Sequence, residues 1–321
     1  TDFGGGYTPQ NASKQWYGDV TVREALGWSL NIPSIKVMQA YSIDKSVAGA
    51  KSLGIALDTG RNHDLTLALG SEEVSLLAMA NAYAAFADEG QQHTNLVVKQ
   101  VNDKFGKKVI SNSATSRQAI NKQGAYLISS ILSDNQTRSS IFGSSLTVGG
   151  HTAAVKTGTT NDNRDAWTIG YNPDYVVGVW VGNNDNAAMA NGGSGMAGPV
   201  WRQTMQQLLT GQVDKKFPIP SGVVQREVCA SNGGLASSAG KGTYSEYFMA
   251  GALPTTSCEP EPTMISVCQL DTKQVLSIDE KKFDSETQSK NVDDCKTRQV
   301  QVCDLSNDKI IMIDEDEFDD A

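Results

Sequence analysis

Three short apolar runs follow one another in the middle of the chain. Residues 151–160 (HTAAVKTGTT) begin with small apolar residues and predict a short buried strand. Residues 165–171 (DAWTIGY) and 175–181 (YVVGVWV) are rich in β-branched and aromatic side chains, which favour strands. Asn-Pro-Asp at 172–174 lies between them, and these residue types favour a turn. The pattern therefore predicts an antiparallel sheet of three strands.

Helical patterns lie on both sides of these strands in the sequence. Thr21 and Glu24 form a T-x-x-E capping box at the start of one amphipathic helix. Pro33 must end that helix and can open a second one. Residues 71–87 are apolar on almost every side, which is typical of a core helix, with Ser71 as candidate cap. Further helices are predicted at 48–55, 124–132 and 199–209, and Pro199 opens the last of them. A polar connection is predicted at 133–145 and an outlying hairpin at 96–110. Together these elements indicate a mixed α/β (α+β) fold.

The composition changes after residue 214. Lys215 to Gly222 is Pro-rich and marks a boundary, and the rest is loop-rich with strand-like pieces at 264–267 and 310–313. We expect three regions: residues 1–214, a Cys-containing extension at 215–262, and a loop-rich region with an acidic tail at 263–321. Inspection of the sequence finds no internal repeat.

The net charge of −9 is unevenly distributed. From Asp304 to the end there are eight acidic residues and one basic residue, so this segment carries seven of the nine excess negative charges. We expect it to be a solvated, disordered end. The nearly neutral remainder has no electrostatic footprint for nucleic acid. No run approaches the roughly 20 apolar residues of a membrane span, and the chain opens at Thr1 without a signal segment, so we expect a piece of a longer protein.

The five cysteines all lie late in the chain. None has the close paired spacing of a zinc site, and the three histidines are scattered, so no metal site is predicted. Cysteines in a polar, Gly-rich and Ser-rich region favour disulfides and an oxidising compartment outside the cytoplasm. An odd number leaves one unpaired. The cysteines are Cys229, Cys258, Cys268, Cys295 and Cys303.

A cation, two hydroxyls and a glycine follow one another at the end of the first predicted strand. They are Lys156, Thr157, Gly158 and Thr159. Such residues can bind a carboxylate while the bare strand edge pairs with a peptide. The sequence therefore predicts a strand that holds a substrate.

A second candidate segment lies between the first two predicted helices. In an extended turn, residues two apart project the same way, so Ser29 Oγ and the Asn31 amide could face one cleft. The alternative is that Asn31 only caps the second helix. Both this S-x-N pattern and K-T-G are short enough to occur by chance.

Longer blocks resemble a known family in order and spacing. They are TVREALGWSLNIPSIK, KSLGI, LALGSEEVSLLAMANAYAAFADEG, VKTGTTNDNRDAWTIGY and VVGVWVGNNDN. They resemble the transpeptidase domain of bifunctional (class A) penicillin-binding proteins over about residues 1–210. VCASNGGLAS and TYSEYFMAGALPTTSC resemble the segment that follows that domain. The resemblance implies an antiparallel sheet flanked by helices with an all-helical lobe, like serine β-lactamases and transpeptidases, and a disulfide between Cys229 and Cys258.

The family uses three motifs, S-x-x-K with the nucleophilic Ser, S-x-N, and K-T-G. Ser29 and Asn31 match the second, and Lys156 to Gly158 match the third. The first should lie upstream of the second, and nothing between Thr1 and Val20 fits it. We therefore expect the nucleophile to belong to polypeptide that precedes Thr1.

A rival alignment would complete the site within this chain. Ser42 to Lys45 spell S-x-x-K, and Ser133 to Asn135 spell S-D-N. We prefer Ser29, because the helix after Ser42 is amphipathic whereas a nucleophile helix in the core should be apolar. Ser133 also lies only about twenty residues before Lys156, too few to reach an opposite lobe and return.

The resemblance implies a peptidoglycan D,D-transpeptidase that needs no cofactor and takes D-Ala-D-Ala stem peptides or β-lactams through a serine ester. It implies that the parent protein is also a glycosyltransferase, held by a missing N-terminal anchor on the extracytoplasmic face of a bacterial membrane. This fragment alone is then inactive. The alternative is a non-catalytic β-lactam sensor or peptide-binding module.

The resemblance also assigns roles to the motif residues. Ser29 would relay a proton, Lys156 would hold the local potential positive, and Asn31 would hold the substrate amide. Thr157 and Thr159 would bind the substrate carboxylate, Gly158 would let the acyl chain pair along the strand, and the Thr159 N–H would be an oxyanion donor.

Overall fold

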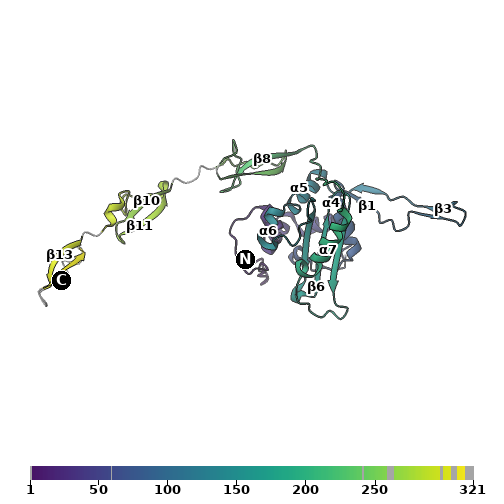
Figure 1. The fold of residues 1–321 in the computed structure, drawn as a ribbon, viewed down its shortest axis with the longest axis horizontal. Coiled ribbons are helices and arrows are strands. Elements are labelled where there is room, and N and C mark those ends of the chain that lie inside the picture. Colours follow the sequence, from purple (N-terminus) through teal and green to yellow (C-terminus); the bar gives the residue numbers. More distant parts are fainter. Residues whose placement is uncertain are drawn as a thin grey trace. The chain divides into compact units, whose positions relative to one another are not determined.

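The computed structural model describes residues 2–58, 60–240, 242–258, 264–296, 299–304 and 309–314 (Figure 1). The chain forms two compact units. One comprises Thr1–Arg226 with Ser245–Leu253, and the other comprises Glu227–Tyr244 with Pro254–Ala321. The three-region division stays a prediction. Among the described residues, no helix is both long and apolar enough to cross a membrane.

The predicted three-stranded sheet is confirmed. It consists of β5 (Ala154–Thr159), β6 (Asp165–Tyr171) and β7 (Val176–Gly182), antiparallel and in the order β5-β6-β7. Asn172 makes the turn between β6 and β7, because its side-chain oxygen accepts hydrogen bonds from the backbone N–H groups of Asp174, at 3.1 Å, and Tyr175, at 2.8 Å. Within the described residues, β5 is therefore an edge strand.

Helices cover both faces of this sheet (Figure 1). On one face α7 (Gly193–Leu209) packs Trp201 and two further apolar residues against Val155. On the other face α4 (Leu76–Ala87) and α5 (Lys122–Leu132) enclose an aromatic cluster around Tyr171, which includes Ala154. Alternate residues of β5 thus face opposite sides, as the strand period requires.

The N-terminal helices are α1 (Val22–Gly27), α2 (Asn31–Tyr41) and α3 (Ile43–Ser52), followed by the 3-10 helix η1 (Leu65–Leu69). Residues before α1 form no helix or strand in the described part. The capping box is present, since Thr21 accepts from the Glu24 N–H and Glu24 from the Thr21 N–H. Arg23 of α1 forms ion pairs with Asp134 and Glu246. These contacts join α1 to Asp134, the N-cap residue of the helix Asn135–Phe142, and to Glu246.

Two predictions about helices before β5 were wrong. The helix expected from Ser71 begins at Leu76, because the Ser75 side chain accepts from the Ala78 N–H and caps it instead. The polar connection expected at 133–145 contains α6 (Asn135–Phe142), which Asp134 caps. Its residues are mostly polar, so no apolar periodicity indicated a helix. The signal in the sequence was Asp134, a residue type that favours the N-cap position.

The start of α7 was also predicted wrongly. Pro199 lies inside the helix, which begins six residues earlier at Gly193. A Cβ at Gly193 would lie 2.5 Å from the Gly158 carbonyl oxygen and 2.6 Å from that of Trp167. The glycines before Pro199 allow this end of the helix to contact the sheet, so packing overrides their low helix propensity.

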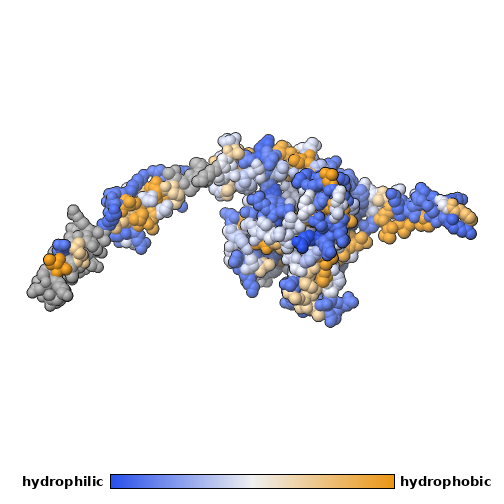
Figure 2. Space-filling view, viewed as in Figure 1, coloured by the Kyte–Doolittle hydropathy of each residue, from blue (hydrophilic) through white to orange (hydrophobic). Residues whose placement is uncertain are grey.

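The outlying hairpin is confirmed. It consists of β2 (Gln100–Asn102) and β3 (Lys108–Ser111), and every residue in both strands is exposed. A shorter pair, β1 (Gln91–His93) and β4 (Ser116–Gln118), joins the hairpin to the end of α4. Hydrophobic patches lie along it in Figure 2.

The C-terminal region consists of small β elements. The strands are β8 (Val223–Cys229), β9 (Thr243–Met249), β10 (Met264–Gln269), β11 (Gln274–Asp279), β12 (Gln288–Ser289), β13 (Gln299–Asp304) and β14 (Lys309–Asp314). Two 3-10 helices, η3 (Glu280–Lys282) and η4 (Val292–Cys295), lie among them. A further 3-10 helix, η2 (Asn161–Asn163), lies in the first unit between β5 and β6. The predicted strands at 264–267 and 310–313 are confirmed. The disordered acidic end predicted from Asp304 is wrong over Lys309–Asp314, because these residues pair with β13 as strand β14, and its part beyond residue 314 lies outside the described residues.

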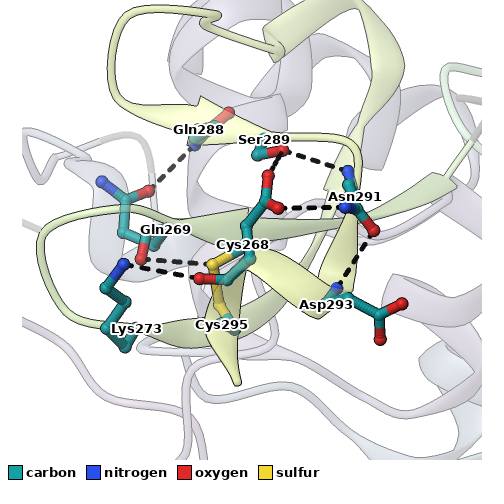
Figure 3. The surroundings of a disulfide bond; sticks show 9 residues. Cys268, Gln269, Lys273, Gln288, Ser289, Asn291, Asp293 and Cys295 are labelled. Atoms are coloured by element: carbon teal, nitrogen blue, oxygen red, sulfur yellow. Dashed lines mark hydrogen bonds between the residues drawn. A yellow bond between two sulfur atoms is a disulfide. The ribbon is translucent and has the colours of Figure 1, made fainter. Parts of the chain in front are cut away.

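Two disulfides hold this region. The Cys229–Cys258 bridge is confirmed, with 5.4 Å between its Cα atoms. A second bridge joins Cys268 of β10 to Cys295 of η4, also with 5.4 Å between Cα atoms (Figure 3).

Candidate active site

The Lys156 side chain leaves β5 on the face that carries Ala154, towards α1 and α5. Its Nζ donates to Ser29 Oγ at 2.6 Å and to the Thr157 carbonyl oxygen at 2.8 Å. The two predicted segments are thus brought together across 127 residues of sequence. Among the described residues, Lys156 has no carboxylate partner.

Burial changes the chemistry of this amine. It lowers the pKa of Lys156 from its usual value to about 8, because removal from water disfavours the charged form. A group with such a pKa holds and releases a proton near neutral pH. The 2.6 Å contact makes Ser29 Oγ the neighbour through which that proton can be exchanged.

Ser29 has a strained backbone. Its φ is 59°, the left-handed region that a helix C-terminus usually gives to glycine. The Leu30 N–H donates to the Ala25 carbonyl at 2.9 Å and closes α1 in a Schellman-type turn. A serine at this position costs about 1 kcal/mol or more relative to glycine. The turn, rather than an extended segment as predicted, directs Ser29 Oγ to Lys156.

The Asn31 side chain bonds to the N-terminal loop. Asn31 is the first residue of α2. The N-cap residue is Leu30, whose side chain makes no capping hydrogen bond. The Asn31 amide instead donates to the Gln10 carbonyl at 2.8 Å. The capping alternative is therefore wrong. The side-chain oxygen of Asn11 accepts from the Ile32 N–H at 3.3 Å, a contact between the N-terminal loop and α2 that sequence reasoning missed.

Thr157 and Thr159 lie on the opposite face of β5 from Lys156. Thr159 Oγ1 accepts from the Gly193 N–H at 2.9 Å, so its own hydroxyl proton remains available to a ligand. The Thr157 hydroxyl forms no hydrogen bond within the described residues. A Cβ at Gly158 would lie 3.4 Å from the Trp167 Cβ, so the glycine keeps this strand thin. The Lys156 amine and the hydroxyls of Thr157 and Thr159 therefore lie on opposite faces of β5, and a ligand could reach both only along the free edge of the strand.

The residues of the rival alignment have structural roles. Ser42 caps α3 through the Lys45 N–H, and Lys45 Nζ lies 5.7 Å from the centre of the Tyr41 ring. No residue of α3 is buried, unlike a nucleophile helix in a core. Asp134 caps α6 and pairs with Arg23. None of these side chains bonds to Lys156 within the described residues.

A cavity of about 570 Å³ lies at the other end of β5. Thr147 to Thr152 contribute one wall, and Tyr126, Phe217 and Tyr247 contribute aromatic side chains. Ser29 and Lys156 do not line it. The candidate site is therefore the strand edge and not this cavity.

Comparisons with known proteins agree with this fold. Residues 3–206 match the family described as penicillin binding protein transpeptidase domain, and residues 219–262 match the penicillin-binding protein 1A C-terminal domain. The penicillin-binding protein 1A of Neisseria lactamica is 32% identical over 225 residues, 68% of this chain and 28% of the relative. That of Clostridium botulinum is 27% identical over 261 residues, 78% of this chain and 31% of the relative. The chain thus spans less than a third of these relatives.

Solved structures are similar over the same part. Penicillin-binding protein 1A from Haemophilus influenzae superposes with a TM-score of 0.70 at 24% identity, covering 78% of this chain and 43% of that one. PonA1 from Mycobacterium tuberculosis, in complex with penicillin V, gives 0.59 at 27% identity, covering 66% and 62%.

Proposed function

Because this chain belongs to the transpeptidase family of penicillin-binding proteins, we propose that its β5 edge and Ser29 turn are two walls of an acyl-transfer site for D-Ala-D-Ala stem peptides. The observation that carries the proposal is the 2.6 Å contact between Lys156 Nζ and Ser29 Oγ. The S-x-N and K-T-G segments meet through this contact. An all-helical lobe, to which Ser29 belongs, faces the sheet in this proposal.

The reaction is acyl transfer through a serine ester. The attacking hydroxyl comes from an S-x-x-K segment that precedes Thr1 in the parent protein. Ser29 passes a proton to the leaving amine, and Lys156 sets the local potential. The pKa of Lys156 near 8 suits this role, because the amine is close to the pH at which it acts.

The substrate lies along the free edge of β5. Thr159 holds the carboxylate with the hydroxyl proton that its bond to Gly193 leaves available, and Thr157 adds a second hydroxyl. Gly158 lets the peptide pair with the strand, and the Thr159 N–H is one oxyanion donor. Asn31 must release its bond to Gln10 or offer its side-chain oxygen to hold the substrate amide.

The parent protein in this proposal acts on the extracytoplasmic face of a bacterial membrane and carries a glycosyltransferase as well. Two disulfides support the location, because such bridges persist in oxidising compartments. Its partners are peptidoglycan stem peptides and β-lactams.

A fluorescent penicillin tests the site. We expect residues 1–321 alone to form no covalent adduct and the parent protein to be labelled. In the parent, Ser29→Ala and Lys156→Met should lower the labelling rate roughly 10²- to 10⁴-fold, because each removes part of the proton path. Lys45→Met is the matched control and should label at the wild-type rate.

A labelled band from residues 1–321 that disappears in Ser42→Ala would favour the rival alignment. A parent protein that is labelled but does not cross-link stem peptides would support the β-lactam sensor instead.

A further inference from the structure

The C-terminal region contains an internal repeat that inspection of the sequence missed. Residues 265–284 and 300–319 are related by a shift of 35 positions, and eight of the twenty aligned residues are identical. Chance would give roughly one. The identical pairs are Val267 and Val302, Cys268 and Cys303, Leu270 and Leu305, Ile278 and Ile313, Asp279 and Asp314, Glu280 and Glu315, Phe283 and Phe318, and Asp284 and Asp319.

The strand registers repeat with the same shift. In β10 and β11, Met264 pairs with Asp279 and Cys268 pairs with Val275. In β13 and β14 the equivalent pairs are Gln299 with Asp314, and Cys303 with Ile310. Since register depends on the whole pattern of inward and outward side chains, the agreement along both hairpins is evidence independent of the identities.

The outer strands also share an exposed position. Val275 of β11 is 56% exposed and Ile310 of β14 is 71% exposed. Hydrophobic surface is visible over β10 and β11 in Figure 2. The two hairpins are therefore equivalent in sequence and in strand pairing, and they share this exposed position.

The first copy is completed by residues that follow its hairpin. β12 pairs with the end of β10, Cys268 opposite Ser289, and η4 then brings Cys295 to the bridge (Figure 3). Gln288 donates to the Gln269 side chain at 3.2 Å. The bridge spans 27 residues and leaves Val267 and Cys268 fully buried.

The same arrangement, a cysteine near the end of a strand that is bridged to one further along the chain, occurs in the preceding strand pair, β8 and β9. Cys229 ends β8, follows a buried Val228, and is bridged to Cys258 29 residues later. A Val-Cys pair thus lies at the end of β8, and one residue before the end of β10 and of β13, at residues 228–229, 267–268 and 302–303. In the first two copies, the cysteine is bridged to one 27 or 29 residues further along.

We propose that Cys303 opens a third disulfide of this series, with a cysteine 27 to 29 residues C-terminal to it, at positions 330 to 332 of the parent polypeptide. The other four cysteines of the chain are already bridged to one another. A two-stranded hairpin is marginal in water by itself, so β13 and β14 need the third strand and bridge that complete the first copy.

The bond forms by thiol–disulfide exchange. The two thiols lose two protons and two electrons and become one S–S bond. The disulfide of an extracytoplasmic thiol–disulfide oxidoreductase accepts them through a mixed disulfide and becomes a dithiol.

Peptide mapping of the intact parent protein tests the proposal. The protein is alkylated with N-ethylmaleimide without reduction, digested, and analysed by mass spectrometry. We expect the Cys303 peptide linked to a peptide from positions 330 to 332. Alkylated Cys303, a bond from Cys303 to any of the other four cysteines, or a bond between Cys303 of two chains would overturn the proposal, as would a reading frame without a cysteine there.

A second measurement compares residues 1–321 with a chain extended to position 335. The shorter chain should take up one N-ethylmaleimide, at Cys303, and the extended chain none; Cys303→Ser in the shorter chain is the matched control and should take up none. Amide exchange in β13 and β14 should slow at least tenfold in the extended chain, while β10 and β11 stay unchanged. Equal exchange in both chains would contradict a completed third module.

Discussion

The described residues contain two three-stranded antiparallel sheets that are stabilised in different ways. The sheet β5-β6-β7 is covered by helices on both faces and buries large side chains such as Trp201 and Tyr171. In the sheet β11-β10-β12, Val267 and Cys268 are the buried residues of the described strands, and a disulfide closes the loop. The two sheets therefore have the same number of strands but different sources of stability. Helices supply apolar burial to the first sheet, and a covalent bond constrains the unfolded state of the second.

The largest expected effect is in the first sheet. Trp201→Ala should lower the free energy of unfolding of that unit by about 3–5 kcal/mol, because a fully buried indole that contacts β6 would leave a cavity. Urea denaturation followed by fluorescence measures this change. Val200→Ala, on the same helix at 49% exposure, is the control and should change stability by less than about 0.5 kcal/mol. Loss of amide protection in β10 as well would show that the two sheets do not unfold separately.

The second effect removes the covalent constraint. Replacing Cys268 and Cys295 together by Ser should cost the β10–β12 segment about 2–4 kcal/mol. Since the segment has so little burial, we expect its amide protection to be lost while β5 to β7 keep theirs. Hydrogen exchange with mass spectrometry reports both sheets at once, and Ser277→Ala on the exposed side of β11 is the control. Persistent protection of β10 would mean that strand pairing alone suffices there.

The smallest effect depends on pH. Burial lowers the pKa of Lys156 from 10.5 to about 8 in the folded state. Between these values the unfolded chain still binds the proton and the folded chain does not, so stability should rise with pH across this window. Relative to Lys156→Met, the wild type should gain about 2 kcal/mol from pH 8 to pH 10. Urea denaturation at several pH values measures the difference, and one that is flat or falls with pH would refute the buried-amine interpretation.

Local chemistry was predictable from the sequence where neighbouring residues decide the structure. The capping box at Thr21, the turn at Asn172 and the strand with Lys156 all depend on residues a few positions apart. Where local propensity competed with packing, prediction failed. The glycines before Pro199 have a low helix propensity, yet they lie within α7, where Gly193 approaches β5 too closely for a side chain to fit.

By itself, the sequence determined the order of the strands, the motif residues and the family. Only the tertiary structure decided that Ser29 takes a left-handed backbone conformation and meets Lys156, that the Asn31 amide is bound by Gln10, and that two hairpins share one register. The contacts of Ser29 with Lys156 and of Asn31 with Gln10 join segments 127 and 21 residues apart. Their side chains meet only after helices and strands have packed, and no local pattern carries that information.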